Sequence, residues 1–196
     1  FPFFSGFYSK DTIIEAVALS HLSGAGYAYF CVIVGVFVTA FYSFRMYFLV
    51  FHGKERFDQN PDAHHGDHHG HDDHHHHEPH ESPWVVTVPL VLLAIPSVVV
   101  GFMFIKPMLF GDFFKDVIFV NADRHPAMAK LAEIFHGPAA MALHGLQTAP
   151  FWLALAGVAA SYYMYLVNPA LPAAIKARVQ PIYTLLENKY YLDWIN

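Results

Sequence analysis

The chain has 196 residues, of which 55% are hydrophobic, 17% are aromatic and 14% carry a formal charge. Soluble domains typically have about 25% charged residues, so this composition indicates an integral membrane protein. The net charge of −5 is local, because seven acidic residues lie between positions 58 and 81, where no Lys or Arg occurs. Since the rest of the chain is only slightly basic, we expect no nucleic-acid partner.

The first segment, residues 1–22, is mostly apolar and carries Lys10 near its centre. At about 1.5 Å per helical residue, Lys10 lies about 15 Å from either end, at the midplane of a bilayer with an apolar thickness of about 30 Å. Pro2 and Gly6 argue against one continuous helix. We therefore expect a broken helix that restarts at Lys10 and Asp11, where Asp11 would meet the positive end of the helix dipole.

An ammonium group at this depth is costly unless it is hydrated or paired, and intramembrane Lys residues usually serve ion or proton transport. Burial disfavours the charged form, so Lys10 can act as a proton carrier when neighbouring charges change. The alternative is an interfacial anchor. Asp11 is either the counter-ion of Lys10 or a helix-start acid, and Glu15 either extends a polar track along the same face or is an interfacial carboxylate.

Three further segments have the length and hydropathy of membrane spans, which makes about four in an all-α, polytopic bundle. They cover residues 26–51, 84–105 and 150–167, and Pro89 and Pro96 are expected to kink the second of them without breaking it.

The remaining segments are expected to lie outside the membrane or at its surface. Residues 126–136 have the spacing of a short amphipathic helix, and a second amphipathic stretch in the tail is broken at Pro181. Since the chain begins inside an apolar segment and ends inside an amphipathic pattern, we expect it to be a piece of a longer membrane protein. The predicted parts are the broken helix with the span that follows it (1–56), the histidine-rich loop (57–83), a span (84–110), a connection with short helices (111–149), a span (150–168) and the amphipathic tail (169–196).

Residues 58–82 contain ten histidines among Asp, Gly and Pro, with almost nothing apolar to bury. Imidazole suits Zn²⁺ and Ni²⁺, but a structural site needs a small, fixed set of ligands. We therefore expect a disordered, solvated loop without a metal site. The side of the membrane that holds this loop and the tail carries six Lys or Arg residues against four on the other side, so the positive-inside rule predicts that the loop is cytoplasmic.

Two sequence motifs resemble a known family. FPFFSGFYSKDTI at the start of the chain, followed by VTAFYSFRMYFLVFHGKER, is similar to the antiporter-like, proton-pumping subunits of respiratory complex I. The match is close over residues 1–56 and looser beyond, and YYLDWIN at the end resembles the segment that leads into the long lateral helix of that family.

The resemblance implies a subunit that couples NADH–quinone electron transfer elsewhere in the complex to proton translocation. Lys10 matches the family's Lys in a broken transmembrane helix, the last proton-loading residue before the periplasm, and Asp11 matches the acid beside it. No cofactor is expected in this chain. NADH, flavin, iron–sulfur clusters and quinone would bind partner subunits, and the chain itself would contact lipid, protons and other membrane subunits in the bacterial inner membrane.

Two alternatives remain open at this point. The first is the large subunit of a cation/proton antiporter, which has no redox partner. The second is a membrane-anchored metal-buffering protein built around the histidine-rich loop.

Overall fold

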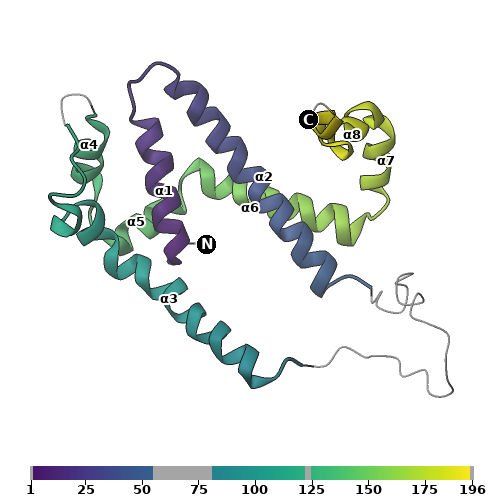
Figure 1. Cartoon of the computed structure of the whole chain (residues 1–196), viewed down its shortest axis with the longest axis horizontal. Coiled ribbons are helices and arrows are strands. Elements are labelled where there is room, and N and C mark those ends of the chain that lie inside the picture. The colour runs from purple at the N-terminus through teal and green to yellow at the C-terminus, as the bar shows by residue number, and fades with distance from the viewer. Residues whose placement is uncertain (1, 55–80, 122–124, 195–196) are drawn as a thin grey trace. The chain divides into compact units, whose positions relative to one another are not determined.

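The computed structural model describes residues 2–54, 81–121 and 125–194, and these residues form helices and their connections (Figure 1). The all-α membrane architecture predicted from the sequence is confirmed. In chain order, the elements are α1 (Ser5–Ala18), α2 (Ala25–Phe51), α3 (Trp84–Leu109), η3 (Asp112–Phe114), α4 (Ala127–Ile134), α5 (Pro138–Gly145), α6 (Ala149–Tyr162), η4 (Tyr163–Val167), α7 (Leu171–Arg178), α8 (Gln180–Glu187) and η5 (Lys189–Trp194).

Three helices among the described residues are long and apolar enough to cross a bilayer. They are α2 with 27 residues, α3 with 26, and α6 together with the π-helical turn η4, which add up to 19. About 20 apolar residues are needed to span the hydrocarbon layer. Helix α1 lies in the first predicted segment, residues 1–22. It has 14 residues and is too short to span the hydrocarbon layer alone.

The break in the first segment lies before the position predicted from the sequence. Helix α1 begins at Ser5 and continues through Gly6 without interruption, while Phe4 is extended and Phe3 has a φ of 73°. The expected restart at Lys10 and Asp11 is therefore wrong. Both residues lie inside the helix, and its first turn contains no acidic residue.

The short helices outside the three long ones follow the proline and glycine positions of the sequence. Helix α4 occupies the predicted amphipathic segment and ends before Gly137, whose φ of 114° suits a residue without a side chain. Pro138 then lies in the first turn of α5, where its missing N–H costs nothing. In the tail, α7 ends at Arg178, and Pro181 lies in the first turn of α8.

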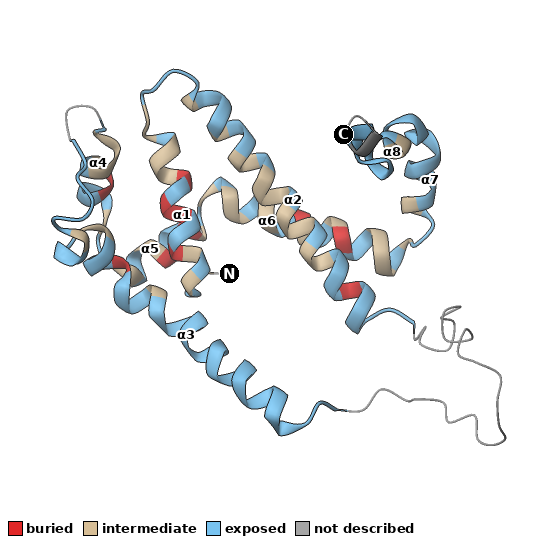
Figure 2. Ribbon diagram, viewed as in Figure 1, coloured by how far each residue is buried: buried red, intermediate tan, exposed pale blue. Residues whose placement is uncertain are grey.

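The chain divides into two compact units, residues 1–36 with 56–153 and residues 37–55 with 154–196. In the first unit, α1 packs against α3, α4 and α5. Its core is formed by Tyr8, Ile105 and Ala142, which are nearly inaccessible to solvent (Figure 2). Because this core is small, most of the surface of α3 is left exposed.

Helices α1 and α3 run in the same direction and approach closely at Gly101. The Ser5 hydroxyl donates a hydrogen bond to the Pro96 carbonyl (3.0 Å) and accepts one from the Gly101 N–H (2.7 Å). A Cβ atom at position 101 would collide with the Ser5 backbone and lie 2.8 Å from the Tyr8 ring. The missing side chain therefore lets the two helices touch, as small residues do in membrane helix pairs.

In the second unit, the last half of α2 packs against α6 and η4. Gly157 permits this contact, because a Cβ atom there would lie 2.6 Å from the Phe37 carbonyl oxygen. The Arg45 guanidinium lies 5.4 Å from the centre of the Tyr165 ring, a cation–π contact that holds the arginine head close to the aromatic side chains at this end of the helix.

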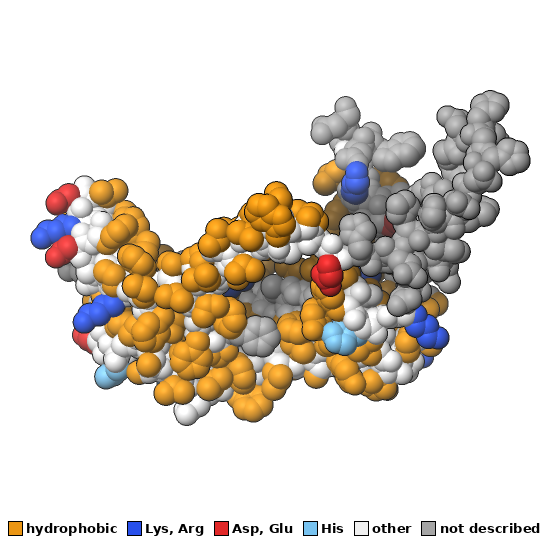
Figure 3. All heavy atoms as spheres, turned by 90° about the horizontal axis from the view of Figure 1, so that it is seen from below, with side chains coloured by type: hydrophobic (Ala, Val, Ile, Leu, Met, Phe, Trp, Pro, Cys, Tyr) orange, Lys and Arg blue, Asp and Glu red, His pale blue; other side chains and the backbone are white. Residues whose placement is uncertain are grey.

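Hydrophobic side chains cover most of the described surface seen in Figure 3. The exposed apolar residues of α2 and α3 form continuous faces along both helices. A soluble monomer rarely exposes patches of this size, whereas lipid or neighbouring membrane helices would cover them.

We predict that Gly101→Ala destabilises the full-length protein by about 1–3 kcal/mol, the usual cost of overpacking a tight contact. Gly35→Ala is the matched control, because position 35 also lies inside an apolar helix and has no atom within 4 Å of a new Cβ. Thermal unfolding in detergent should show a loss for the first variant only. Equal midpoints for the two variants would contradict the close contact between α1 and α3.

Candidate functional site

Helix α1 places the two predicted site residues on different faces. Successive helical residues are turned by about 100°, so Lys10 and Asp11 cannot point the same way. In the described part of the chain, Lys10 is exposed to solvent, whereas Asp11 is only 5% exposed and faces the small core. One oxygen of the Asp11 carboxylate, Oδ2, is buried without a hydrogen-bond partner among the described residues.

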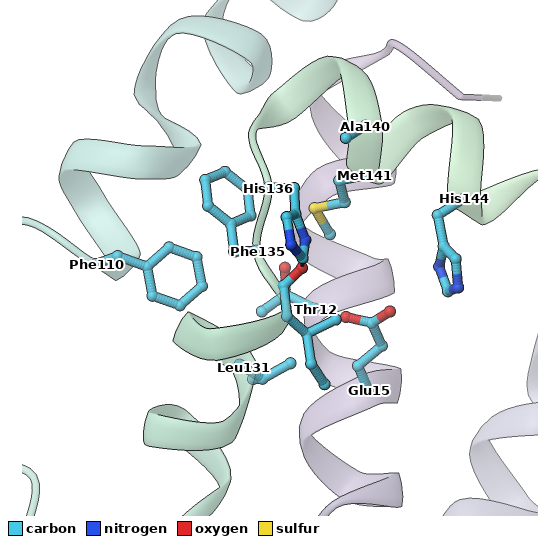
Figure 4. A pocket seen from close by; sticks show the side chains of 10 residues that line it. Thr12, Glu15, Phe110, Leu131, Phe135, His136, Ala140, Met141 and His144 are labelled. Carbon is cyan, nitrogen blue, oxygen red and sulfur yellow. Dashed lines mark hydrogen bonds between the residues drawn. The ribbon is translucent and has the colours of Figure 1, made fainter.

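A cavity of about 310 Å³ lies between the second half of α1 and the segment that contains α4 and α5 (Figure 4). Its polar side chains come from α1, from α5 and from the link between α4 and α5. The lining residues are Thr12, Glu15, Phe110, Leu131, Ile134, Phe135, His136, Ala140, Met141 and His144.

Two of the polar side chains in the cavity are committed to backbone groups. The Thr12 hydroxyl donates to the Tyr8 carbonyl (2.7 Å), and Nδ1 of His136 donates to the Ile134 carbonyl (2.6 Å). Glu15 and His144 are turned towards one another across the gap between α1 and α5 (Figure 4).

Asp11, Glu15 and His144 form an electrostatically linked group. The charges of Glu15 and His144 both act on Asp11, and that of His144 acts on Glu15. Asp11 is buried, Glu15 is half-buried and His144 is exposed, so the three side chains lead from the core of the first unit to its surface. Ionisable groups arranged in this way are suited to holding and exchanging protons.

Comparisons with known proteins identify the family. The chain is 57% identical to NADH-quinone oxidoreductase subunit L of Neisseria meningitidis, over 98% of this chain and 29% of that protein. The chain belongs to this family. Its relatives include NADH-ubiquinone oxidoreductase chain 5 of Cryptococcus neoformans, 33% identical over 98% of this chain and 26% of that protein. F(420)H(2) dehydrogenase subunit L of Methanosarcina mazei is 32% identical over 95% of this chain and 25% of that protein.

The chain therefore spans about three tenths of the length of the Neisseria meningitidis proteins that it matches. No protein-family model matches it. The names of the relatives confirm the resemblance to complex I subunits and do not favour the antiporter or the metal-buffering protein.

Among the described residues, no three His, Cys, Asp or Glu side chains are placed to hold a metal ion. The histidine-rich segment lies largely outside the described residues, so the expected lack of a metal site there stays a prediction.

The sequence did not indicate that Glu15 and His144 line the same cavity. An isolated histidine in a connecting segment gives no local signal of function, and we expected His144 to face water or the interface. The structure brings it to Glu15 because the next residue, Gly145, lies against the Phe7 ring of α1, where a Cβ atom would collide with that ring. This contact joins segments that are far apart in the sequence.

We predict that Asp11→Asn raises the free energy of unfolding by about 1 kcal/mol, because a neutral amide of the same shape is easier to bury than a partly unpaired carboxylate. The control is Asp112→Asn, since the Asp112 side chain is 89% exposed and its ion pair with Lys115 is at the surface. Thermal unfolding of the full-length protein measures both variants. A clear loss of stability on Asp11→Asn would show that the charge has a strong partner elsewhere in the protein.

Proposed function

We propose that this chain is part of the proton-translocating membrane subunit of an NADH-quinone oxidoreductase. The observation that carries the proposal is its 57% identity with subunit L of Neisseria meningitidis over 98% of its own length. Electron transfer from NADH to quinone would take place in partner subunits, which hold the flavin and the iron–sulfur clusters. This chain would contribute membrane helices and a proton carrier to the bacterial inner membrane.

Lys10 is the residue proposed to carry the proton. The contacts of Ser5 with Pro96 and Gly101 set the start of α1 beside the middle of the 26-residue helix α3. Lys10 follows Ser5 by five residues, or about 7.5 Å along the helix. It would therefore lie inside the hydrocarbon layer and displaced from the midplane, towards the connection between α3 and α6.

The exposed position of Lys10 is compatible with this role. The chain covers about 29% of its relative's length, and the face of α1 that carries Lys10 would be covered by the rest of such a protein. There the ammonium would meet polar groups or water, because an unpaired charge inside the membrane is too costly. A lysine can release its proton in that setting, whereas an arginine stays protonated.

The proposal predicts that Lys10→Ala, in the full-length protein within the intact complex, lowers proton pumping by about tenfold or more, a modest loss for a positioned proton-transfer group. NADH oxidation coupled to pumping should fall with it, while assembly of the complex is retained. Lys115→Ala is the matched control, since the Lys115 side chain is exposed and makes only a surface ion pair. Both are measured in reconstituted vesicles.

Lys10→Arg separates a carrier from an anchor. A guanidinium cannot release its proton at physiological pH, so pumping should fail nearly as badly as in Lys10→Ala. An interfacial anchor would tolerate the change, because Arg extends to the interface as well as Lys does. Pumping at the wild-type rate by Lys10→Arg would refute the carrier role.

The proposed orientation places the histidine-rich loop in the cytoplasm and the connection between α3 and α6 in the periplasm. Helix α3 begins after the loop and ends at this connection, so the two segments lie at opposite ends of α3. The Lys and Arg count favours the loop side as cytoplasmic. A topology reporter inserted in residues 58–82 should report the cytoplasm, and one inserted after Asn121 should report the periplasm. The reverse result would overturn the orientation, and two signals from one side would overturn the number of crossings.

A further inference from the structure

The cavity beside α1 lies on the same side of the first unit as the connection between α3 and α6. Helices α1 and α3 are parallel, and the cavity is lined by the second half of α1, by Phe110 just after α3, and by residues of α4 and α5. Along α1, the cavity therefore lies on the C-terminal side of Lys10. This is the direction in which the helix would leave the membrane. Ionisable groups at this place would lie between Lys10 and water on this side.

The side chains that line the cavity leave few candidates for proton exchange. Helix α4 contributes Leu131 and Ile134, and the end of α3 is followed by Phe110, so neither element brings a titratable group. The titratable side chains that line the cavity are therefore Glu15, His136 and His144. His136 donates a hydrogen bond from Nδ1 to a backbone carbonyl, whereas Glu15 from α1 and His144 from α5 face one another (Figure 4).

A second, independent observation points to the same place. Asp11 precedes Glu15 by one helical turn, so the two carboxylates lie on one face of α1. Asp11 is 95% buried, and its Oδ2 has no hydrogen-bond partner among the described residues. A buried carboxylate oxygen without a protein partner is costly unless a proton or a water molecule satisfies it. Such a group is suited to accept a proton and pass it on.

We propose that Glu15 and His144 are proton-transfer residues that connect Asp11, next to Lys10, with water on the side of the connection between α3 and α6. This inference rests on the proposed function and adds the route by which the proton leaves. A cavity of about 310 Å³ has room for several water molecules, since one occupies about 30 Å³ in the liquid. These waters would bridge the distances between side chains that are not in direct contact.

The proton balance along this route closes. Lys10 loses a proton from Nζ and becomes a neutral amine, and the proton is taken up by the Asp11 carboxylate through water. It then passes to the Glu15 carboxylate and to the His144 imidazole, each of which returns to its starting state when it releases the proton. The last acceptor is water at the exposed edge of His144. No electron moves, and no group other than water is needed.

The test measures proton pumping by the intact complex in vesicles for Glu15→Gln and His144→Gln. Each substitution keeps the size of the side chain and removes its ability to take up a proton at neutral pH, so pumping should fall by about tenfold or more. Glu133→Gln and His125→Gln are the matched controls, because both residues are exposed and neither lines this cavity. They should pump at the wild-type rate.

Two rescue experiments distinguish proton transfer from a structural role. Glu15→Asp keeps a carboxylate on the same helix face and should retain most of the pumping. His144→Ala should lose pumping and regain it when imidazole is added to the vesicles, since free imidazole can replace the missing proton acceptor. If Glu15→Asp fails like Glu15→Gln, or if imidazole restores nothing, the residues act only through packing and the inference is wrong.

The outcome for Lys10→Ala separates this inference from the proposed function. If Lys10→Ala stops pumping while Glu15→Gln and His144→Gln pump normally, the route is overturned and Lys10 keeps its role. If Lys10→Ala itself pumps normally, the proposed carrier is wrong and the route falls with it. Loss of pumping in all three, with both rescues, supports the route.

Discussion

The close approach of α1 to α3 at Gly101 is the contact on which the first unit depends. The Ser5 hydroxyl bonds to two backbone groups of α3 there, and the missing side chain of Gly101 leaves room for the Ser5 backbone and the Tyr8 ring. This contact sets the position of α1 along α3. It thereby determines where Lys10 and Asp11 lie relative to a helix that is long enough to cross the membrane.

Fixing α1 in this way turns two neighbouring residues to different faces of the helix. Asp11 is buried against the core formed with α3 and α5, whereas Lys10 faces away from it. The proposed carrier role requires access to two environments in turn, and a short helix with ionisable groups on two faces is suited to that. The remainder of a longer protein would cover Lys10, while Glu15 and His144 line the cavity between α1 and the segment of α4 and α5.

Small residues have the same effect in three places. Gly101 lets α1 meet α3, Gly145 lets α5 meet α1 at the Phe7 ring, and Gly157 lets α6 meet α2. In a bilayer, apolar burial does little to hold helices together, because lipid tails are as apolar as the side chains. Close backbone contact stabilises the helix pairs instead, and α1 and α3 are joined in addition by the two hydrogen bonds of Ser5. The buried core of each unit is correspondingly small.

The sequence by itself determined the all-α class, the three spanning helices and the short helix α4, because each depends on local hydropathy, proline and glycine. It also pointed to Lys10 and Asp11, since a charged pair in an apolar segment is visible without a structure. It misplaced the start of α1, because Gly6 does not break a helix and the extended residue Phe4 does. Only the tertiary structure decided that Glu15 and His144 line the same cavity, since that arrangement depends on the contact of Gly145 with Phe7 between distant segments.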